Sequence, residues 1–431
     1  MEDEKFDAII VGAGLAGSAA ALKLAQAGLE VVVIDRGPYP GSKNLSGGVL
    51  YGNILNELVP EYWEEAPIER VITNQRVMFM TEQAFFNIDF KNQVFNEKPY
   101  NAISVLRGKF DRWFGEKAEE AGAMFVPGIK VDKVVVEDGR AVGVVAGDEE
   151  MRSDVVILAD GTNSFLAEQL GLRKRFNPAH MAVGVKELIG LPKETIEERF
   201  NLTGDQGVAY GIVGYATQGV AGGGFLYTNK ESLSIGLVMH LDELIETSRK
   251  PAEMMDEFLA HPSIEPLIRG GKLLEYGAHM VPEGGLAMMP KMVMNGLLIT
   301  GDAAGFSINN GFVVRGMDLA LSSGKSAAEA VLKAKDTGDF SESSLATYTK
   351  LLEESFVLKD MHTYAGAPSF MKNERMYEPY PEMLVSMMTK IYSHTGQPKE
   401  HIVPIAMKSL KESGVSLFNL AGDGLKGVRS L

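Results

Sequence analysis

The chain has 431 residues, of which 45% are hydrophobic and 23% charged, and its net charge at pH 7 is −15. This length is too great for one ordinary core, so we expect two intertwined domains. The negative charge argues against a nucleic-acid partner, because binding a phosphate backbone needs a basic surface. The lack of cysteine excludes disulfides and an iron–sulfur cluster held by the chain's own thiolates, and the seven histidines show no ligand-like spacing, so we predict no metal site.

The first residues, MEDEKFD, are acidic, whereas a secretory signal begins with a basic segment. No run of about twenty uninterrupted apolar residues appears in the sequence. We therefore expect a cytoplasmic protein without a membrane span.

The N-terminal segment has the pattern of a mononucleotide-binding unit. A buried strand is predicted at residues 6–11, a helix of small residues follows the sequence GAGLAG, and a second buried strand ends near Asp35. Gly12 permits the tight turn, Gly14 lets the backbone approach a pyrophosphate, and Gly17 lets the helix pack on the strand. Asp35 can accept hydrogen bonds from an adenosine ribose. The pattern therefore predicts a dinucleotide site, and the alternative is a glycine-rich packing turn.

The middle of the chain alternates between strands, loops and one helix. Residues 38–52 are expected to form a loop, and residues 109–122 an amphipathic helix. Residues 130–161 are predicted to form a β-meander that ends in a buried strand. Residues 180–240 alternate apolar and polar side chains among many glycines, which is typical of a mixed sheet.

A second glycine-rich motif, GDAAGFSINNG, begins at Gly301 directly after a buried strand. Its small residues let the backbone approach a ligand, and Asp302 can hold the hydroxyls of a sugar-like chain. A long helix is predicted over residues 315–338, and the N-terminus of a helix favours negative charge. Together with the N-terminal unit, this motif predicts the ribityl and isoalloxazine part of FAD as the ligand. If the Gly301 motif is considered alone, the alternative is that it only caps the start of a helix.

The rest of the chain is predicted to be mostly helical and rich in methionine. The sequence GDGLKG, from Gly422 to Gly427, also matches the spacing of a dinucleotide loop, but the chain provides no room for a helix after it. We interpret this segment as a flexible tail.

Six stretches occur in a fixed order along the chain. They are AIIVGAGLAGSAAALKLAQAGLEVVVIDRG, KNLSGGVLYG, VLRGKFDRWFGEKAEEAGA, ILADGTNS, GGGFLYTNKESLSIGLV and GDAAGFSINNGFVVRGMDLALSSGKSAAEA. Together they resemble the electron-transfer flavoprotein–quinone oxidoreductase family, above all its short bacterial FixC-type branch. The two outer glycine motifs are shared with hydroxylases and geranylgeranyl reductases of the same superfamily, whereas KNLSGG and GGGFLYTNKESLSIGLV discriminate better.

The resemblance implies an α/β fold, in which a Rossmann-like FAD-binding domain is interleaved with a mixed-sheet substrate domain and followed by a helical C-terminal region. We expect a discontinuous FAD-binding domain at residues 1–80, 100–175 and 275–340, a mixed-sheet substrate or quinone domain at residues 81–99 and 176–274, and a C-terminal helical region and tail at residues 341–431.

The resemblance also implies which residues contact FAD. The phosphates and the adenosine are expected against Gly12, Gly14, Ala16, Gly17, Asp35 and Arg36, the flavin ring near Ser46, Gly47 and Gly48, the pyrophosphate at Arg107, the adenine at the backbone of Val131, and the ribityl chain and ring at Gly301, Asp302, Asn310 and Gly311. For Arg107 the alternative is a solvated loop arginine, and for Val131 it is an ordinary position inside a strand.

A quinone pocket is expected at Gly223, Phe225 and Tyr227, where glycine allows close approach and the rings supply apolar contacts. The alternative for this stretch is strand core beside the flavin. Residues 367–392, rich in methionine and aromatic side chains, form a second candidate for membrane or partner docking, against the alternative of a buried helix face. We name no catalytic side chain, because the redox chemistry belongs to the flavin.

The function implied is that of an FAD-dependent oxidoreductase passing electrons from a two-subunit electron-transferring flavoprotein to a membrane quinone, either menaquinone or ubiquinone. Long members of the family carry an iron–sulfur cluster in a C-terminal domain, so this cysteine-free chain is expected to work with a separate ferredoxin-like subunit at the inner face of the cytoplasmic membrane. Some such complexes bifurcate electrons, which no residue of this chain indicates. The alternatives are a polyprenyl-lipid reductase of the geranylgeranyl type and an assembly subunit with structural FAD.

Overall fold

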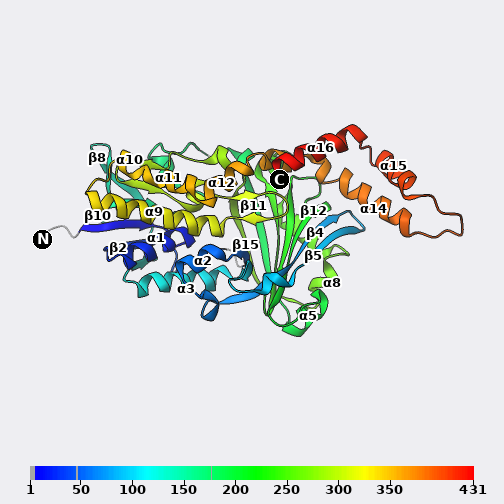
Figure 1. Ribbon diagram of the computed structural model, residues 1–431, viewed down its shortest axis with the longest axis horizontal. Coiled ribbons are helices and arrows are strands. Elements are labelled where there is room, and N and C mark those ends of the chain that lie inside the picture. Colours follow the sequence, from blue (N-terminus) through cyan, green and yellow to red (C-terminus); the bar gives the residue numbers. More distant parts are fainter. Residues whose placement is uncertain (1–4, 45–46, 176) are drawn as a thin grey trace.

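The computed structural model describes residues 5–44, 47–175 and 177–431. Within these residues the chain forms two large sheets and a terminal group of helices (Figure 1). The first sheet lies at the end of the molecule where the chain begins, the second sheet crosses the middle, and the last helices project at the other end. The predicted α/β architecture is confirmed.

The first sheet is built on parallel strands that are apolar over almost their whole length. Ala8, Ile9 and Ile10 of its central strand are fully buried, as expected for a parallel sheet covered on both faces. Its strand order is β16 (Val293–Met294), β17 (Leu297–Ile299), β10 (Glu149–Leu158), β1 (Lys5–Val11), β2 (Val31–Asp35) and β7 (Met124–Pro127). In addition, β9 (Arg140–Ala146) pairs with β10, and β8 (Val131–Glu137) pairs with β9. The meander predicted at residues 130–161 is thus present.

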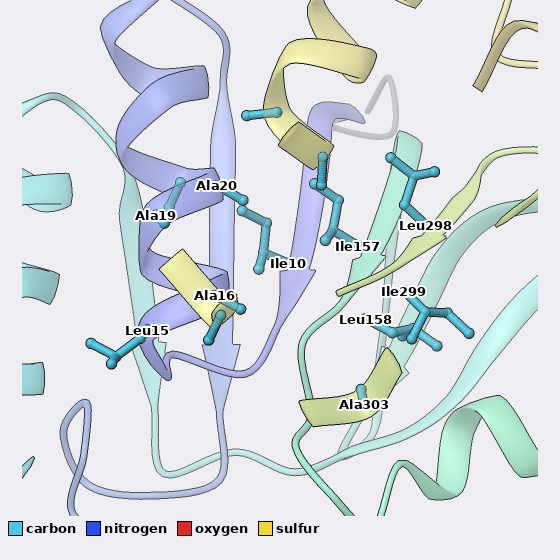
Figure 2. Close-up of a cluster of buried hydrophobic side chains, with 14 of the residues drawn as sticks. Ile10, Leu15, Ala16, Ala19, Ala20, Ile157, Leu158, Leu298, Ile299 and Ala303 are labelled. Atoms are coloured by element: carbon cyan, nitrogen blue, oxygen red, sulfur yellow. The ribbon is translucent and has the colours of Figure 1, made fainter. Parts of the chain in front are cut away.

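Three helices pack on this sheet, and they form where the sequence predicts helices. They are α1 (Leu15–Gln26), α3 (Arg107–Glu120) and α9 (Met317–Thr337). Small side chains on α1, among them Ala16, Ala19 and Ala20, bring this helix close to the strands, beside Ile10 (Figure 2). An added Cβ at Gly324 of α9 would collide with the carbonyl of Ala16, so α1 and α9 also touch closely. The N-terminal and Gly301 motifs therefore meet in space.

The second sheet is mixed and has one apolar and one more polar face. Its strand order is β15 (Lys272–Pro282), β11 (Met181–Gly190), β14 (Ser232–His240), β13 (Gly222–Thr228), β12 (Gln206–Gly214), β4 (Ile68–Met80), β6 (Ala102–Val105) and β3 (Gly48–Tyr51), with β5 (Phe85–Lys91) paired to β4. Val185, Leu226 and Leu237 pack from one face against α5 (Lys193–Phe200) and α7 (Pro251–Ala260). The opposite face is left for the site described below.

The strands of the two sheets do not follow the domain segments expected from the sequence. The segments 1–80, 100–175 and 275–340 contribute strands to both sheets, because β3, β4 and β6 pair in the second one, and residue 275 lies inside β15. The expectation that residues 38–52 form only a loop is wrong, since β3 pairs with β6 across residues that are about fifty positions away. Residues 48–51 therefore form a strand because β6, which is distant in sequence, pairs with them through backbone hydrogen bonds.

The remaining helices are short and lie mainly in the last quarter of the chain. They are α2 (Asn53–Leu58), α4 (Phe165–Gln169), α6 (Leu241–Thr247), α8 (Glu265–Ile268), α10 (Glu342–Leu345), α11 (Thr347–Glu354), α12 (Phe356–Thr363), α13 (Ala367–Met371), α14 (Pro379–Tyr392), α15 (Ile402–Glu412) and α16 (Leu417–Ser430), and a two-stranded sheet joins β18 (Ile308–Asn309) to β19 (Val314–Arg315).

The interpretation of the last residues as a flexible tail is wrong. GDGLKG lies inside α16, which Ser416 caps by accepting a hydrogen bond from the backbone of Asn419 at 3.0 Å. Gly427 packs against the ring of Phe370, and Asp423 is buried against Arg375. Tertiary contacts thus hold a glycine-rich helix that local propensity disfavours.

Candidate active site between the two sheets

The N-terminal glycines have different structural tasks. An added Cβ would collide with the carbonyl of Ala159 at Gly12 and with the carbonyl of Gly12 at Gly17. Gly12 also has a φ of +106°, which side chains rarely adopt. At Gly14, by contrast, an added Cβ would meet no atom within 4 Å. Gly12 and Gly17 therefore fit the turn to the strand and helix, while the backbone at Gly14 remains open to a ligand.

Asp35 is fixed beside this turn. Its carboxylate accepts hydrogen bonds from the backbone N–H of Ala13 at 2.8 Å and of Gly37 at 2.6 Å. Each oxygen keeps further acceptor capacity, so the carboxylate can also receive ribose hydroxyls. The N–H of Ile129 bonds to the carbonyl of Asp35 at 3.1 Å, which brings the start of β8, with the buried Val131, near this point. Arg36 is exposed.

Asp302 lies in a one-turn helix after β17, immediately behind the glycine turn. An added Cβ at Gly301 would lie 2.7 Å from the Cβ of Ala16, so only glycine lets the two motifs approach. Burial raises the pKa of Asp302, while Arg107, His279 and a 3.3 Å hydrogen bond from Thr162 Oγ1 oppose this rise. A half-buried carboxylate with such modest support can accept hydroxyl hydrogen bonds.

Arg107 begins α3 and is oriented by its own helix. Its Nε and Nη2 atoms both bond to the carboxylate of Asp111 at 2.7 Å, and Asp111 is buried. The positive charge of Arg107 also lowers the pKa of Asp302. The guanidinium therefore lies at the side of the site that holds the Gly301 motif, and the alternative of a solvated loop arginine does not fit this position.

The polar face of the second sheet supplies the other wall. Phe225 and Tyr227 of β13 stack with ring centroids 5.1 Å apart, and Tyr227 is paired with Ser234 across the sheet. Lys186 of β11 lies in the same region, with Nζ 5.7 Å from the centre of the Phe225 ring. At Gly223 an added Cβ would lie 2.8 Å from the carbonyl of Ile212, so this glycine also serves the pairing of β12 with β13.

The loop at Gly47 connects the two walls. Gly47 has a φ of +75°, and an added Cβ there would collide with the side chain of Ser234 on β14. Its carbonyl accepts a hydrogen bond from the Lys186 ammonium group. An added Cβ at Gly48 would lie 2.9 Å from Met317 at the start of α9. Ser46, also expected at the flavin ring, lies outside the described residues.

The turn at Asn310 and Gly311 closes the opposite side. Asn310 is buried and accepts hydrogen bonds from the N–H of Phe312 at 3.1 Å and of Val313 at 2.9 Å. The carbonyl of Gly311 points toward β12, where an added Cβ at Gly211 would lie 3.8 Å away from it. This turn therefore lies close to β12 of the second sheet.

Comparison with known proteins decides the family. Residues 7–80 match the family model for an FAD dependent oxidoreductase, residues 181–281 that for ETF-QO, ubiquinone-binding, and residues 367–431 that for the ETF-QO/FixC family C-terminal domain. The chain is 47% identical to the probable electron transfer flavoprotein-quinone oxidoreductase YdiS of Escherichia coli (strain K12) and 49% identical to protein FixC of Salmonella typhi, each over 100% of both chains. The chain belongs to the ETF-QO/FixC family.

A solved structure supports the fold of this ETF-QO/FixC protein. A geranylgeranyl bacteriochlorophyll reductase-like protein from Thermoplasma acidophilum matches it with a TM-score of 0.73 and 22% identity, over 97% of this chain and 99% of the other. At this identity the likeness concerns the fold alone. The expected family, the expected FAD cofactor and the expected oxidoreductase class are confirmed.

The site of the ETF-QO/FixC protein fits FAD. The open backbone at Gly14 lies at the N-terminus of α1, which favours a pyrophosphate, and the carboxylates of Asp35 and Asp302 can each receive sugar hydroxyls. The individual contacts to FAD remain predictions for Gly12, Gly14, Ala16, Gly17, Asp35, Arg36, Gly47, Gly48, Arg107, Val131, Gly301, Asp302, Asn310 and Gly311.

Sequence reasoning missed three polar residues of this site, namely Lys186, His279 and Thr162. Lys186 and His279 are single polar side chains within strands, whereas Thr162 lies in the stretch ILADGTNS, which contributed to the family resemblance but to no site prediction. The signal available for Lys186 was a lysine, next to Glu187, in the mostly apolar stretch MAVGVKELIG. Its strand register, which places it opposite Gly236 and Gly277, became visible only in the sheet.

Proposed function

We propose that this protein passes electrons from a two-subunit electron-transferring flavoprotein to a membrane quinone, menaquinone or ubiquinone, as a subunit of a complex with a ferredoxin-like iron–sulfur protein. The observation that carries the proposal is the stacked pair of Phe225 and Tyr227, which lies in the segment that matches the ubiquinone-binding model. This aromatic wall faces the Gly47 loop. An aromatic wall beside a flavin site suits a flat, apolar acceptor ring.

The chain's own residues bind and orient the two reactants in this proposal. When bound, FAD supplies the redox centre that accepts and gives up electrons. Asp302 and the turn of Asn310 and Gly311 hold its sugar chain and ring edge. Phe225 and Tyr227 present an apolar surface to the quinone and exclude water from it, which strengthens the electrostatic effect of nearby charges.

The partners are proposed on two grounds. The relative from Escherichia coli is named an electron transfer flavoprotein-quinone oxidoreductase, and we infer the same class of donor and acceptor here. The chain has no cysteine, so an iron–sulfur cluster in the complex has to be held by another subunit.

A peripheral position at the membrane is supported by the surface of the last helices. No helix of the described residues is long and apolar enough to cross a bilayer. Exposed apolar side chains nevertheless gather on α15 and α16, among them Ile402, Val403, Phe418 and Val428. These two helices carry four lysine or arginine residues against two acids in a chain whose net charge is −15. An amphipathic, locally basic pair of helices suits an anionic membrane surface.

The test begins with anaerobic, photoreduced holoprotein. We expect a soluble naphthoquinone, and menaquinone or ubiquinone carried in anionic vesicles, to restore the absorbance of oxidised flavin within seconds. A geranylgeranylated lipid should leave the flavin reduced. Reoxidation by that lipid with formation of a saturated product would support a polyprenyl-lipid reductase, which is the alternative, and no response to any acceptor would support an assembly subunit with structural FAD.

A further inference from the structure

Lys186 is the one cationic side chain that the structure places between the loop expected at the flavin ring and the proposed quinone wall, among the residues it describes. Its ammonium group donates a hydrogen bond to the carbonyl of Gly47 and lies 5.7 Å from the centre of the Phe225 ring. These contacts hold the nitrogen at the junction of the two surfaces. An acceptor ring stacked along Phe225 would present its oxygen within reach of this nitrogen.

The register of the sheet keeps room around this side chain. Lys186 pairs with Gly236 on β14 and with Gly277 on β15, so both neighbouring positions lack side chains. An added Cβ at Gly236 would lie 2.6 Å from the Phe225 ring, which shows that this ring occupies the space beside Lys186. The lysine therefore extends over a floor of glycines toward the Gly47 loop.

Several charged or titratable groups surround Lys186. Arg107 at the start of α3 and Glu275 on β15 act on it electrostatically. His279 on β15 and Tyr227 on β13 lie further along the same part of the sheet, and the neighbouring positions on β14 are Ser234 and Gly236. Beyond these, Tyr51 on β3 acts on Tyr227, and Asp302 after β17 is affected by Arg107 and His279. Burial and the Arg107 cation lower the pKa of Lys186 to about 7, and Glu275 opposes this change. An acid with such a pKa is well matched to proton transfer near neutral pH.

We propose that Lys186 is the proton donor to the quinone oxygen in the acceptor pocket, an inference that rests on the proposed function. Reduction of a quinone to a quinol takes two electrons, which the reduced flavin supplies, and two protons. Lys186 supplies one of these protons. Its N–H bond breaks, the quinone O–H bond forms, and the neutral amine stays hydrogen-bonded to the carbonyl of Gly47. The second proton is the one that fully reduced flavin releases when it gives up two electrons near neutral pH.

A cavity lies further along the second sheet, and Lys186 is not among the residues that line it. Leu188 follows two residues after Lys186, and Ser232 and Leu274 lie nearby on the adjacent strands β14 and β15. All three line a cavity of about 610 Å³. The amine regains its proton from solvent after each turnover, and this cavity brings solvent to within two residues of Lys186 along β11.

The test compares Lys186→Met and Lys186→Arg with the wild type. Photoreduced holoprotein is mixed with a soluble naphthoquinone between pH 5.5 and 9. In the wild type the reoxidation rate should be constant at low pH and fall tenfold per pH unit above a bend near pH 7, because only the ammonium form donates. Both variants should lose this bend and react about 100-fold more slowly at pH 6. Arginine keeps the charge but does not release a proton in this range.

Two further measurements separate proton transfer from other roles. Ferricyanide accepts electrons without a proton, so it should reoxidise the flavin of all three proteins at rates within about twofold. The pH dependence of acylation of Lys186, followed by mass spectrometry in apoprotein and holoprotein, should have its midpoint near pH 7. The exposed Lys272 of β15 is the reference site, and Lys272→Met is the matched control with an unchanged pH profile.

The outcomes are distinct. If quinone fails to reoxidise even the wild-type flavin, the proposed function is wrong and the role of Lys186 falls with it. If quinone reacts but Lys186→Arg keeps the wild-type profile, the lysine acts through charge alone and the proton-donor role is overturned. Equal slowing with ferricyanide, or acylation only at strongly alkaline pH, would overturn it as well.

Discussion

Asp302 is a half-buried carboxylate that receives little hydrogen-bonding support from its neighbours. Its hydrogen bond from Thr162 is 3.3 Å long, and Arg107, which acts on it electrostatically, is itself bonded to Asp111. Such a group is costly in an empty site and effective when ligand hydroxyls bond to it. Lys186 is likewise tuned by its surroundings, because burial and the neighbouring Arg107 lower its pKa from the ordinary value of a lysine.

We predict that Asp302→Asn weakens FAD binding by about tenfold to 100-fold, because hydrogen bonds to a charged group contribute roughly 1.5–3 kcal/mol. The dissociation constant is measured by fluorescence titration of apoprotein with FAD. Asp336→Asn, an exposed change on α9, serves as the control and should bind like the wild type. An unchanged affinity for Asp302→Asn would show that this carboxylate does not contact the cofactor.

At the scale of elements, α16 depends on an ion pair between the half-exposed Arg375 and the buried Asp423. Arg375 bonds through Nε at 2.6 Å and through Nη2 at 2.9 Å to the carboxylate of Asp423, and the Tyr380 hydroxyl donates to the same group at 2.5 Å. The ion pair holds the pKa of Asp423 well below its usual range. This stabilisation is therefore present above about pH 4 and is lost as the pH falls below it.

We predict that Asp423→Asn lowers the free energy of local unfolding of α16 by about 2–3 kcal/mol, because the charge-assisted bidentate pair is lost. Hydrogen exchange of residues 417–430 should accelerate by roughly 30-fold to 150-fold in the fast-closing regime. Glu412→Gln, which breaks an exposed pair with Lys390, should change exchange by less than about fivefold. Equal effects of the two substitutions on exchange would show that the Arg375–Asp423 ion pair does not hold α16 in place.

At the scale of the whole molecule, the cofactor site joins the two sheets. Leu50, Val71 and Ile103 of the second sheet belong to the same buried cluster as Ile9 and Val33 of the first. The predicted FAD contacts likewise come from both sides of this junction. A ligand bound there stabilises both halves at once, because it binds the folded state and not the unfolded chain.

We predict that removing FAD lowers the melting temperature, and that adding free FAD to 100 times its dissociation constant restores about 2.7 kcal/mol of stability. Calorimetry should show one transition that moves as a unit with FAD concentration. Two transitions, of which only one responds to FAD, would show that the sheets unfold independently. NADP added at the same concentration is the control ligand and should leave the transition unchanged.

The sequence alone determined those features that depend on short spacing. The turn of Gly12, Gly14 and Gly17 needs its glycines within six residues, and the helices at α3 and α9 have an apolar periodicity that needs no distant partner. The family followed from several such stretches in order. The tertiary structure decided whatever depends on distant contacts.

The contact between Lys186 and Gly47 joins residues 139 positions apart, and no local pattern encodes it. The strand β3 exists because β6 supplies its hydrogen bonds, and α16 is helical because Arg375 and Phe370 compensate for its glycines. Local spacing therefore fixes where the cofactor motifs lie, whereas burial and long-range pairing fix which side chains can act beside them.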